Sequence, residues 1–245
     1  MFKSFLLVSC FVFFMSGCSS VYMPNVPNTP MLTKQGEFSG GAHTSLKGNA
    51  SVNGAYAVSD HVGLLISGST MNYSRRSKDF NHRLIEIGGG YFTTFGDENK
   101  RILEIYAGVG KGSSDITYRE YSNDVLKNSE VQKVAYRKSF LQVNYSSKKS
   151  GTLKLFGTKF PLSYGTALRI SQITMDRFFI NGSVQPKEDN VFFEPIFFTR
   201  MALNNFLQLQ YTTSSNIGLK SRDYLTAGNS IFTIGLIFNV GGKNQ

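Results

Sequence analysis

From Gly36 onward, the chain alternates apolar and polar residues in short runs, and none of its stretches shows a helical period. In the last run the large apolar residues all have the same parity: Phe232, Ile234, Leu236, Phe238 and Val240. Thr233, Gly235 and Asn239 have the opposite parity, with Ile237 as the exception. The same alternation recurs over residues 103–110 and 207–212. This pattern predicts strands with one apolar face and one polar or glycine face.

The alternating runs and the turn residues between them predict about ten antiparallel strands. Their predicted bounds are Glu37–Ser45, Asn49–Val58, Val62–Tyr73, Arg83–Phe95, Ile102–Tyr118, Glu130–Ser146, Leu162–Thr174, Val191–Leu203, Phe206–Ser215 and Ser230–Val240. We expect Leu153–Phe160 to extend the sixth or the seventh strand. The chain is therefore predicted to be all-β.

The connections between these strands alternate in length. Short ones follow the second, fourth and eighth strands, and long ones are expected at Ser74–His82, Arg119–Ser129, Met175–Asn190 and Asn216–Asn229. Such alternation is typical of an up-and-down transmembrane β-barrel, with short turns in the periplasm and long loops outside. A soluble β-sandwich is the alternative, because it also alternates but hides its apolar face. Glycines on the polar face favour the barrel, whose narrow interior leaves little room for opposing side chains.

The first residues of the chain have the features of an export signal. Lys3 precedes an apolar stretch that is too short to span a bilayer, and small residues then lead to Cys18. Ser16-Gly17-Cys18 resembles the lipobox of bacterial lipoproteins, which implies cleavage before Cys18 and diacylglycerol on its thiol; an ordinary signal peptide is the alternative. We therefore divide the chain into a signal peptide at 1–17, an acylated cysteine with an extended Pro-rich tether at 18–35, and a barrel domain at 36–245.

Cysteine content and charge narrow the chemistry. Cys10 would leave with the signal peptide and Cys18 would be acylated, so the mature domain offers no thiolate for catalysis or metal binding. Neither a metal site nor a cofactor motif is recognisable, and we expect no cofactor. The net charge of +10 comes from scattered basic residues, which favours contact with lipid phosphates or lipopolysaccharide over nucleic acid.

The segment Tyr22-Met23-Pro24-Asn25-Val26-Pro27-Asn28-Thr29-Pro30 resembles the region that follows the lipobox in uncharacterised outer-membrane β-barrel lipoproteins of Bacteroidota. Further similarity lies in residues 56–63, 193–195 and 207–211. The resemblance implies a lipid-anchored barrel but no reaction. In that group, lipoproteins exported to the surface usually carry an acidic signal after the cysteine. Ser19-Ser20-Val21-Tyr22 has no acidic residue, which implies an anchor in the periplasmic leaflet of the outer membrane.

Strand parity predicts a set of charged side chains inside the barrel: Glu86, Glu104, Arg169, Glu194 and Arg200. An unpaired buried charge costs several kcal/mol, so we expect these groups to form a luminal network that plugs the barrel. The alternative is a gate or binding site for a charged solute.

A second candidate site lies at the outer rim, where His43, Asp79 and His82 could converge. A carboxylate that orients a histidine beside a water molecule would serve hydrolysis, as in barrel proteases of the omptin type. The flanking residues resemble no omptin motif, and such residues in a polar loop are ordinarily solvated.

These observations favour a non-enzymatic outer-membrane lipoprotein with a plugged barrel. We expect it to be an envelope scaffold or an accessory subunit that contacts lipopolysaccharide or another outer-membrane protein. A narrow channel or carrier for a small polar solute is the first alternative, and a hydrolase that uses the rim is the second.

Overall fold

The computed structural model describes residues 20–45, 48–155, 157–226 and 231–241. The predicted signal peptide and the predicted lipidation site Cys18 lie outside the described residues. Within the described ranges, no helix has the length and apolar character needed to cross a membrane.

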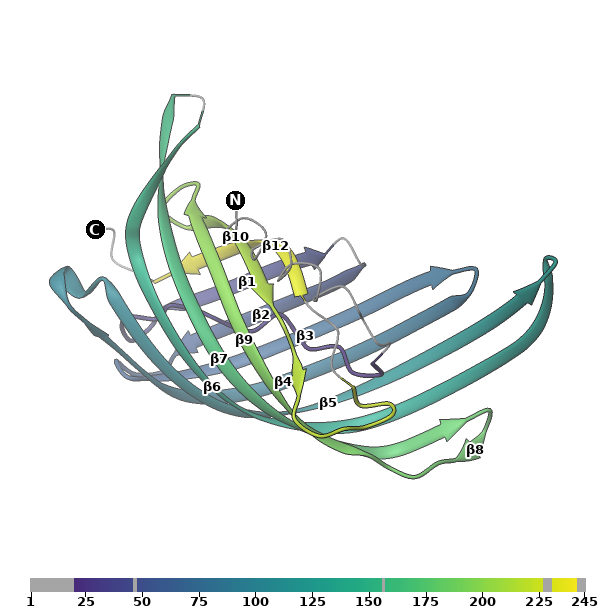
Figure 1. The fold of residues 1–245 in the computed structure, drawn as a ribbon. Coiled ribbons are helices and arrows are strands. Elements are labelled where there is room, and N and C mark those ends of the chain that lie inside the picture. The colour runs from purple at the N-terminus through teal and green to yellow at the C-terminus, as the bar shows by residue number, and fades with distance from the viewer. Residues whose placement is uncertain (1–19, 46–47, 156, 227–230, 242–245) are drawn as a thin grey trace, which may run out of the picture.

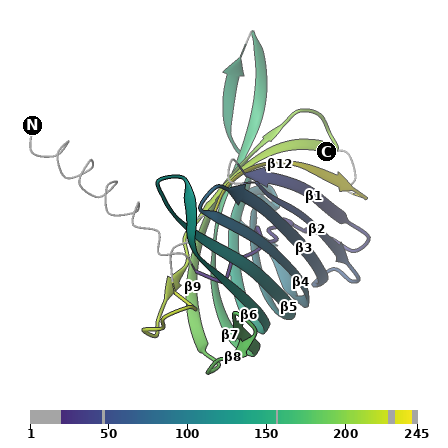
Figure 2. The same ribbon diagram turned by 90° about the vertical axis from the view of Figure 1, so that its right-hand side faces the viewer.

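The chain forms a closed antiparallel barrel of ten strands, which confirms the predicted fold class (Figures 1 and 2). The barrel strands are β1 (Phe38–Ser45), β2 (Asn49–Ala57), β3 (Val62–Arg75), β4 (Lys78–Phe95), β5 (Arg101–Ser122), β6 (Val125–Leu155), β7 (Thr158–Ile180), β9 (Asp189–Ala202), β10 (Leu207–Ser214) and β12 (Ile231–Val240). Each pairs with its neighbour in the chain, and β12 closes the ring on β1. Two short strands add to this ring. β8 (Ser183–Val184) pairs with residues 179–180 of β7, and β11 (Ile217–Gly218) pairs with residues 192–193 of β9.

All ten predicted strands are present, but three segments predicted to be long loops are strand hairpins instead. The segments 74–82, 119–129 and 175–190 continue the ladder as protruding hairpins, because their residues still alternate and pair across tight turns. Two of these turns contain residues at positive φ, Asn123 and Asp124 in the first and Asn181 and Gly182 in the second. Residues 153–155 extend β6 and pair with residues 158–160 of β7, so this stretch extends strands as expected.

The two ends of the barrel therefore differ. One end carries the β3–β4, β5–β6 and β7–β8 hairpins and the connection between β10 and β12, and we call it the long-loop end. The opposite end carries the β2–β3, β4–β5 and β9–β10 turns, and we call it the short-turn end. It also carries the β6–β7 hairpin, which rises at the upper left of Figure 1. The described chain enters β1 and leaves β12 at this short-turn end.

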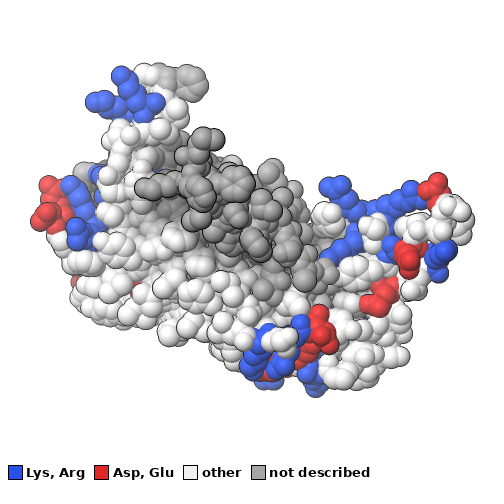
Figure 3. Space-filling view, in the orientation of Figure 1, with Lys and Arg blue, Asp and Glu red and all other residues white. Residues whose placement is uncertain are grey.

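The outer wall is apolar, as the parity of the strands predicts. Ile66, Ile87 and Leu141 are each more than half exposed, and so are Phe232 and Ile234 of β12. Charged side chains gather at the hairpin tips, and the wall between them is largely uncharged (Figure 3). An apolar band of this kind between polar ends is typical of a barrel that sits in lipid. The protein is therefore an outer-membrane-type barrel.

Inward glycines face bulky side chains on the neighbouring strand. Four such pairs lie directly opposite each other in the ladder: Gly108 with Phe140, Gly112 with Tyr136, Gly165 with Phe198, and Gly235 with His43. A Cβ on Gly112 would lie 2.4 Å from the Tyr136 ring. These glycines let large rings lie flat inside a narrow lumen, which is the physical reason for the polar-or-glycine face seen in the sequence.

Candidate functional site: the occupied lumen

The Pro-rich segment, which the sequence predicts to be an extended tether, lies inside the barrel. It is extended, as its prolines predict, and every residue from Ser20 to Leu32 is buried. The segment has no internal secondary structure, so its backbone groups need partners from the barrel wall. Inward side chains of the strands supply many of them.

Near the short-turn end, two buried charges hold the segment through its backbone. The Glu104 carboxylate accepts the Leu32 N–H at 3.1 Å. The Arg200 guanidinium donates to the carbonyl oxygens of Thr29 and Pro30, the latter at 3.2 Å. A carboxylate accepts an N–H and a guanidinium donates to carbonyls, so each charge meets the matching backbone group.

In the middle of the lumen, the asparagines of the segment make the contacts. The Asn28 side-chain amide donates to the Gly54 carbonyl at 2.8 Å, and Gln142 donates to the Asn28 carbonyl at 2.7 Å. Ser69 donates to the Asn25 side chain. The amides of the repeated Asn-x-x-Asn pattern are thus recognised by the wall.

Toward the long-loop end, Tyr22 lies within a buried cluster of four charges. Lys138 Nζ lies 2.7 Å from a Glu86 oxygen and donates to the Tyr22 hydroxyl at 2.7 Å. That hydroxyl donates to Glu194 at 2.9 Å, so Tyr22 bridges the lysine and the second carboxylate. Arg169 lies 3.3 Å from the other Glu86 oxygen. Two carboxylates and two cations therefore balance in charge.

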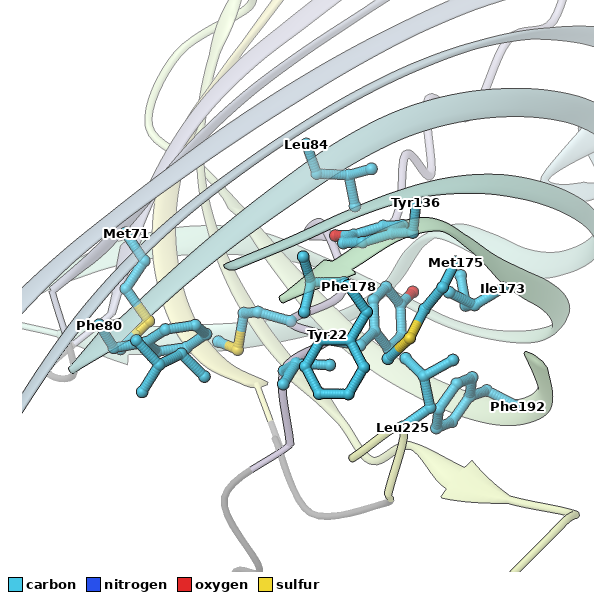
Figure 4. Packing of buried hydrophobic residues seen from close by; sticks show 14 of the residues in the cluster. Tyr22, Met71, Phe80, Leu84, Tyr136, Ile173, Met175, Phe178, Phe192 and Leu225 are labelled. Carbon is cyan, nitrogen blue, oxygen red and sulfur yellow. The ribbon is translucent and has the colours of Figure 1, made fainter. Parts of the chain in front are cut away.

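Apolar packing surrounds this cluster on the long-loop side (Figure 4). The Tyr22 ring meets Phe192 at a centroid distance of 4.9 Å and Tyr136 edge-on at 5.8 Å. Ile173, Phe178 and Leu225 belong to the same buried cluster. The segment is thus held by burial as well as by hydrogen bonds.

The connection between β10 and β12 covers the same end of the lumen. Glu188 accepts the backbone N–H groups of Asp223, Tyr224 and Leu225 at 3.0, 3.1 and 2.8 Å. The Tyr224 carbonyl in turn accepts the Val21 N–H at 3.2 Å. The cover and the segment are therefore hydrogen-bonded to each other.

Asp189 holds the base of this cover through Lys220 and Arg222. Hydrogen bonds from Lys220 and Arg222 lower the pKa of the Asp189 carboxyl below its usual value. The carboxylate therefore stays ionised in mildly acidic conditions.

All five predicted luminal charges are buried inside the barrel, but they fall into two groups. Glu86, Arg169 and Glu194 belong to the Tyr22 cluster, whereas Glu104 and Arg200 hold the segment near the short-turn end. Sequence reasoning missed Lys138, which lies at the centre of the first group. A signal was present, because the five predicted charges sum to −1 and a dry lumen needs a sixth, positive group.

The three candidate rim residues do not come together. His43 is buried, and its ring lies 3.1 Å from the Asn53 amide. His82 is also buried and bonds Tyr136 at 2.6 Å, whereas Asp79 pairs with Arg119 on the other face of β4. Residues 79 and 82 are three positions apart, so a strand places them on opposite faces. No hydrolytic constellation forms from them.

In the described part of the chain, no group of three or more histidine, cysteine or acidic side chains could hold a metal ion. The luminal carboxylates Glu86, Glu104 and Glu194 have cationic, amide, hydroxyl or backbone partners. The arrangement is suited to binding a peptide segment.

No family model matches the chain, and no curated protein is significantly similar to it. Among solved structures, the translocator domain of the autotransporter NalP from Neisseria meningitidis is similar at 11% sequence identity, with a TM-score of 0.47. The similarity covers 83% of this chain and 84% of that domain.

Proposed function

We propose that the protein is a non-enzymatic outer-membrane lipoprotein whose barrel is sealed by its own N-terminal segment and serves as an envelope scaffold or accessory subunit. One observation carries the proposal: every residue from Ser20 to Leu32 is buried in the lumen. A lumen filled in this way leaves the ends of the barrel and the lipid-facing wall for function.

The energetics of the lumen support a seal. Glu86, Lys138, Arg169 and Glu194 are each at most 3% exposed, so a continuous water path would have to open a packed ionic cluster. Losing one partner from such a buried, charge-balanced group strongly destabilises the folded protein, because the other charge stays buried without compensation. A solute channel would ordinarily be lined by hydrated groups instead.

A partner would then meet the protruding hairpins. The long-loop end carries basic and aromatic side chains on the same tips, with Arg76 over Tyr121 at 4.7 Å and Lys78 over Tyr118 at 5.0 Å. Such mixed tips suit the phosphates and sugars of lipopolysaccharide or another outer-membrane protein.

Planar-bilayer recording of the purified, lipidated protein tests the seal. We expect no steady conductance from the wild-type protein. A variant that lacks residues 20–32 tests whether the empty barrel conducts.

A locked variant separates a permanent seal from a gated one. The Asn25 and Ser69 side chains are hydrogen-bonded, so Asn25→Cys with Ser69→Cys can join the segment to β3. A sealed scaffold gives no current in the oxidised or the reduced form. Steady conductance from the wild-type protein and the reduced variant, blocked when the variant is oxidised, would overturn the scaffold and establish a gated channel.

A further inference from the structure

The order of contacts along the segment shows that it runs through the whole barrel. At the short-turn end, the Gln35 N–H donates to Asp60 in the β2–β3 turn at 2.9 Å. Leu32 meets Glu104 near the start of β5, and Asn25 meets Ser69 toward the outer part of β3. Val21 finally meets Tyr224 in the long-loop cover. The chain thus passes from one end of the lumen to the other without turning back.

The length of the segment agrees with a complete crossing. Twelve peptide steps separate Ser20 from Leu32, and an extended chain rises at most ~3.3–3.6 Å per residue, or roughly 40 Å in all. The apolar band of an outer-membrane barrel is ~25 Å tall. Ser20 can therefore lie beyond one face of the band while Thr33, bonded to Glu37 at 2.7 Å, lies at the other.

We propose that the segment threads the mature N-terminus through the barrel, so that the lipid on Cys18 enters the membrane leaflet at the long-loop end, which faces the cell exterior. The proposal rests on the lipidation of Cys18 in the proposed function. It replaces the periplasmic-leaflet anchor that the missing acidic signal implies by resemblance.

Chain geometry leaves little freedom for another path. Two peptide steps separate Cys18 from Ser20, and they reach at most ~7 Å. A return to the short-turn end would need about as many residues as the outward path, through a lumen that the segment already fills. Ser20 is itself buried in the lumen, so this short reach would bring the lipid on Cys18 to the long-loop rim.

Epitope tags on whole cells test this placement. One tag is inserted after Ser19, a second in the β3–β4 turn after Arg76, and a third in the β4–β5 turn after Glu98. The second marks the long-loop end and the third the short-turn end. Antibody binding is measured on intact and on permeabilised cells, and heat-modifiable gel migration verifies that each tagged barrel is folded.

We expect the tags after Ser19 and Arg76 to bind antibody on intact cells, and the tag after Glu98 to bind only after permeabilisation. If the Ser19 tag needs permeabilisation while the Arg76 tag does not, the threading is refuted. If only the Glu98 tag binds on intact cells, the barrel lies the other way round and the surface anchor is refuted. Neither result depends on conductance, so this failure is distinct from failure of the seal.

A disulfide test covers the case in which a tag disturbs folding. Asn25→Cys with Ser69→Cys should cross-link in cells, because the native side chains touch. The matched control is Asn25→Cys with Thr70→Cys, since Thr70 is exposed on the outer face of the same strand. A folded protein in which neither pair, or only the Thr70 pair, cross-links would show that the segment lies outside the lumen.

Discussion

Lys138→Met is the sharpest test of a dry, matched lumen. In the native protein the ammonium is fully buried and contacts Glu86 and the Tyr22 hydroxyl, both at 2.7 Å. Methionine keeps much of the length and apolar volume but removes the charge, which leaves Glu86 and Glu194 with Arg169 as the remaining cation of the cluster. Removing one partner from a buried ionic group costs ~3–5 kcal/mol, and we expect the free energy of unfolding to fall by that amount.

The assay is urea unfolding of the barrel in lipid vesicles, followed by heat-modifiable gel migration. Lys133→Met is the matched control, because Lys133 is exposed on the outer face of the same strand and should change stability by less than ~0.5 kcal/mol. Adding Glu86→Gln to Lys138→Met should restore part of the loss by removing the unmatched carboxylate. A Lys138→Met loss of about 1 kcal/mol or less would mean that water screens the cluster, and the dry lumen would be refuted.

Three further predictions follow from the wall, the glycines and the cover. Gly112→Ala should cost ~1–3 kcal/mol by crowding the facing ring, whereas Gly68→Ala, with no atom nearer than 3.9 Å, should be tolerated; equal urea midpoints would contradict this. Leu236→Arg should slow folding into vesicles and cost ~2–4 kcal/mol, because this side chain faces the lipid, and wild-type folding would refute that orientation. The lowered pKa of Asp189 stabilises the cover above the carboxyl's unfolded pKa near 3.8, and this contribution is lost as the pH falls through the lower folded value. Protection of residues 219–226 from hydrogen exchange, taken relative to the intrinsic rate at each pH, should fall more steeply in acid in the wild type than in Asp189→Asn, and equal pH profiles would count against the clamp.

The wall of the barrel could be read from the sequence because its determinants are local. A strand alternates its faces every residue, so the parity of Phe232 and Leu236 fixes which side chains meet lipid and which meet the lumen. The protruding hairpins were harder, because their charged and hydroxyl residues resemble loops in composition. Lys78 and Tyr118 are ladder partners even though both lie beyond the apolar band.

The position of the N-terminal segment could not be derived from local pattern. Proline spacing predicts an extended chain equally well in solvent and in a lumen, since both impose the same backbone angles. The apolar side chains were the missed signal, because Tyr22, Met23, Met31 and Leu32 are costly in a solvated linker and all four are buried here. Lys138 was also within reach, since it shares the inward parity of Tyr136 and Phe140 on β6.

Polar groups of the barrel wall match the hydrogen-bonding groups of the segment, which argues that the segment does not leave the lumen. Arg200 donates to two backbone carbonyls and Glu104 accepts a backbone N–H, so these charges bind the extended backbone rather than a particular side chain. In an empty lumen, both would lose those partners and need water in their place. Tyr22, by contrast, is bound as a side chain, through its hydroxyl and its ring. Hydrogen bonds to its backbone therefore keep the segment in the lumen. Tyr22 fixes its position along the barrel axis, which would keep its outer end at the long-loop face.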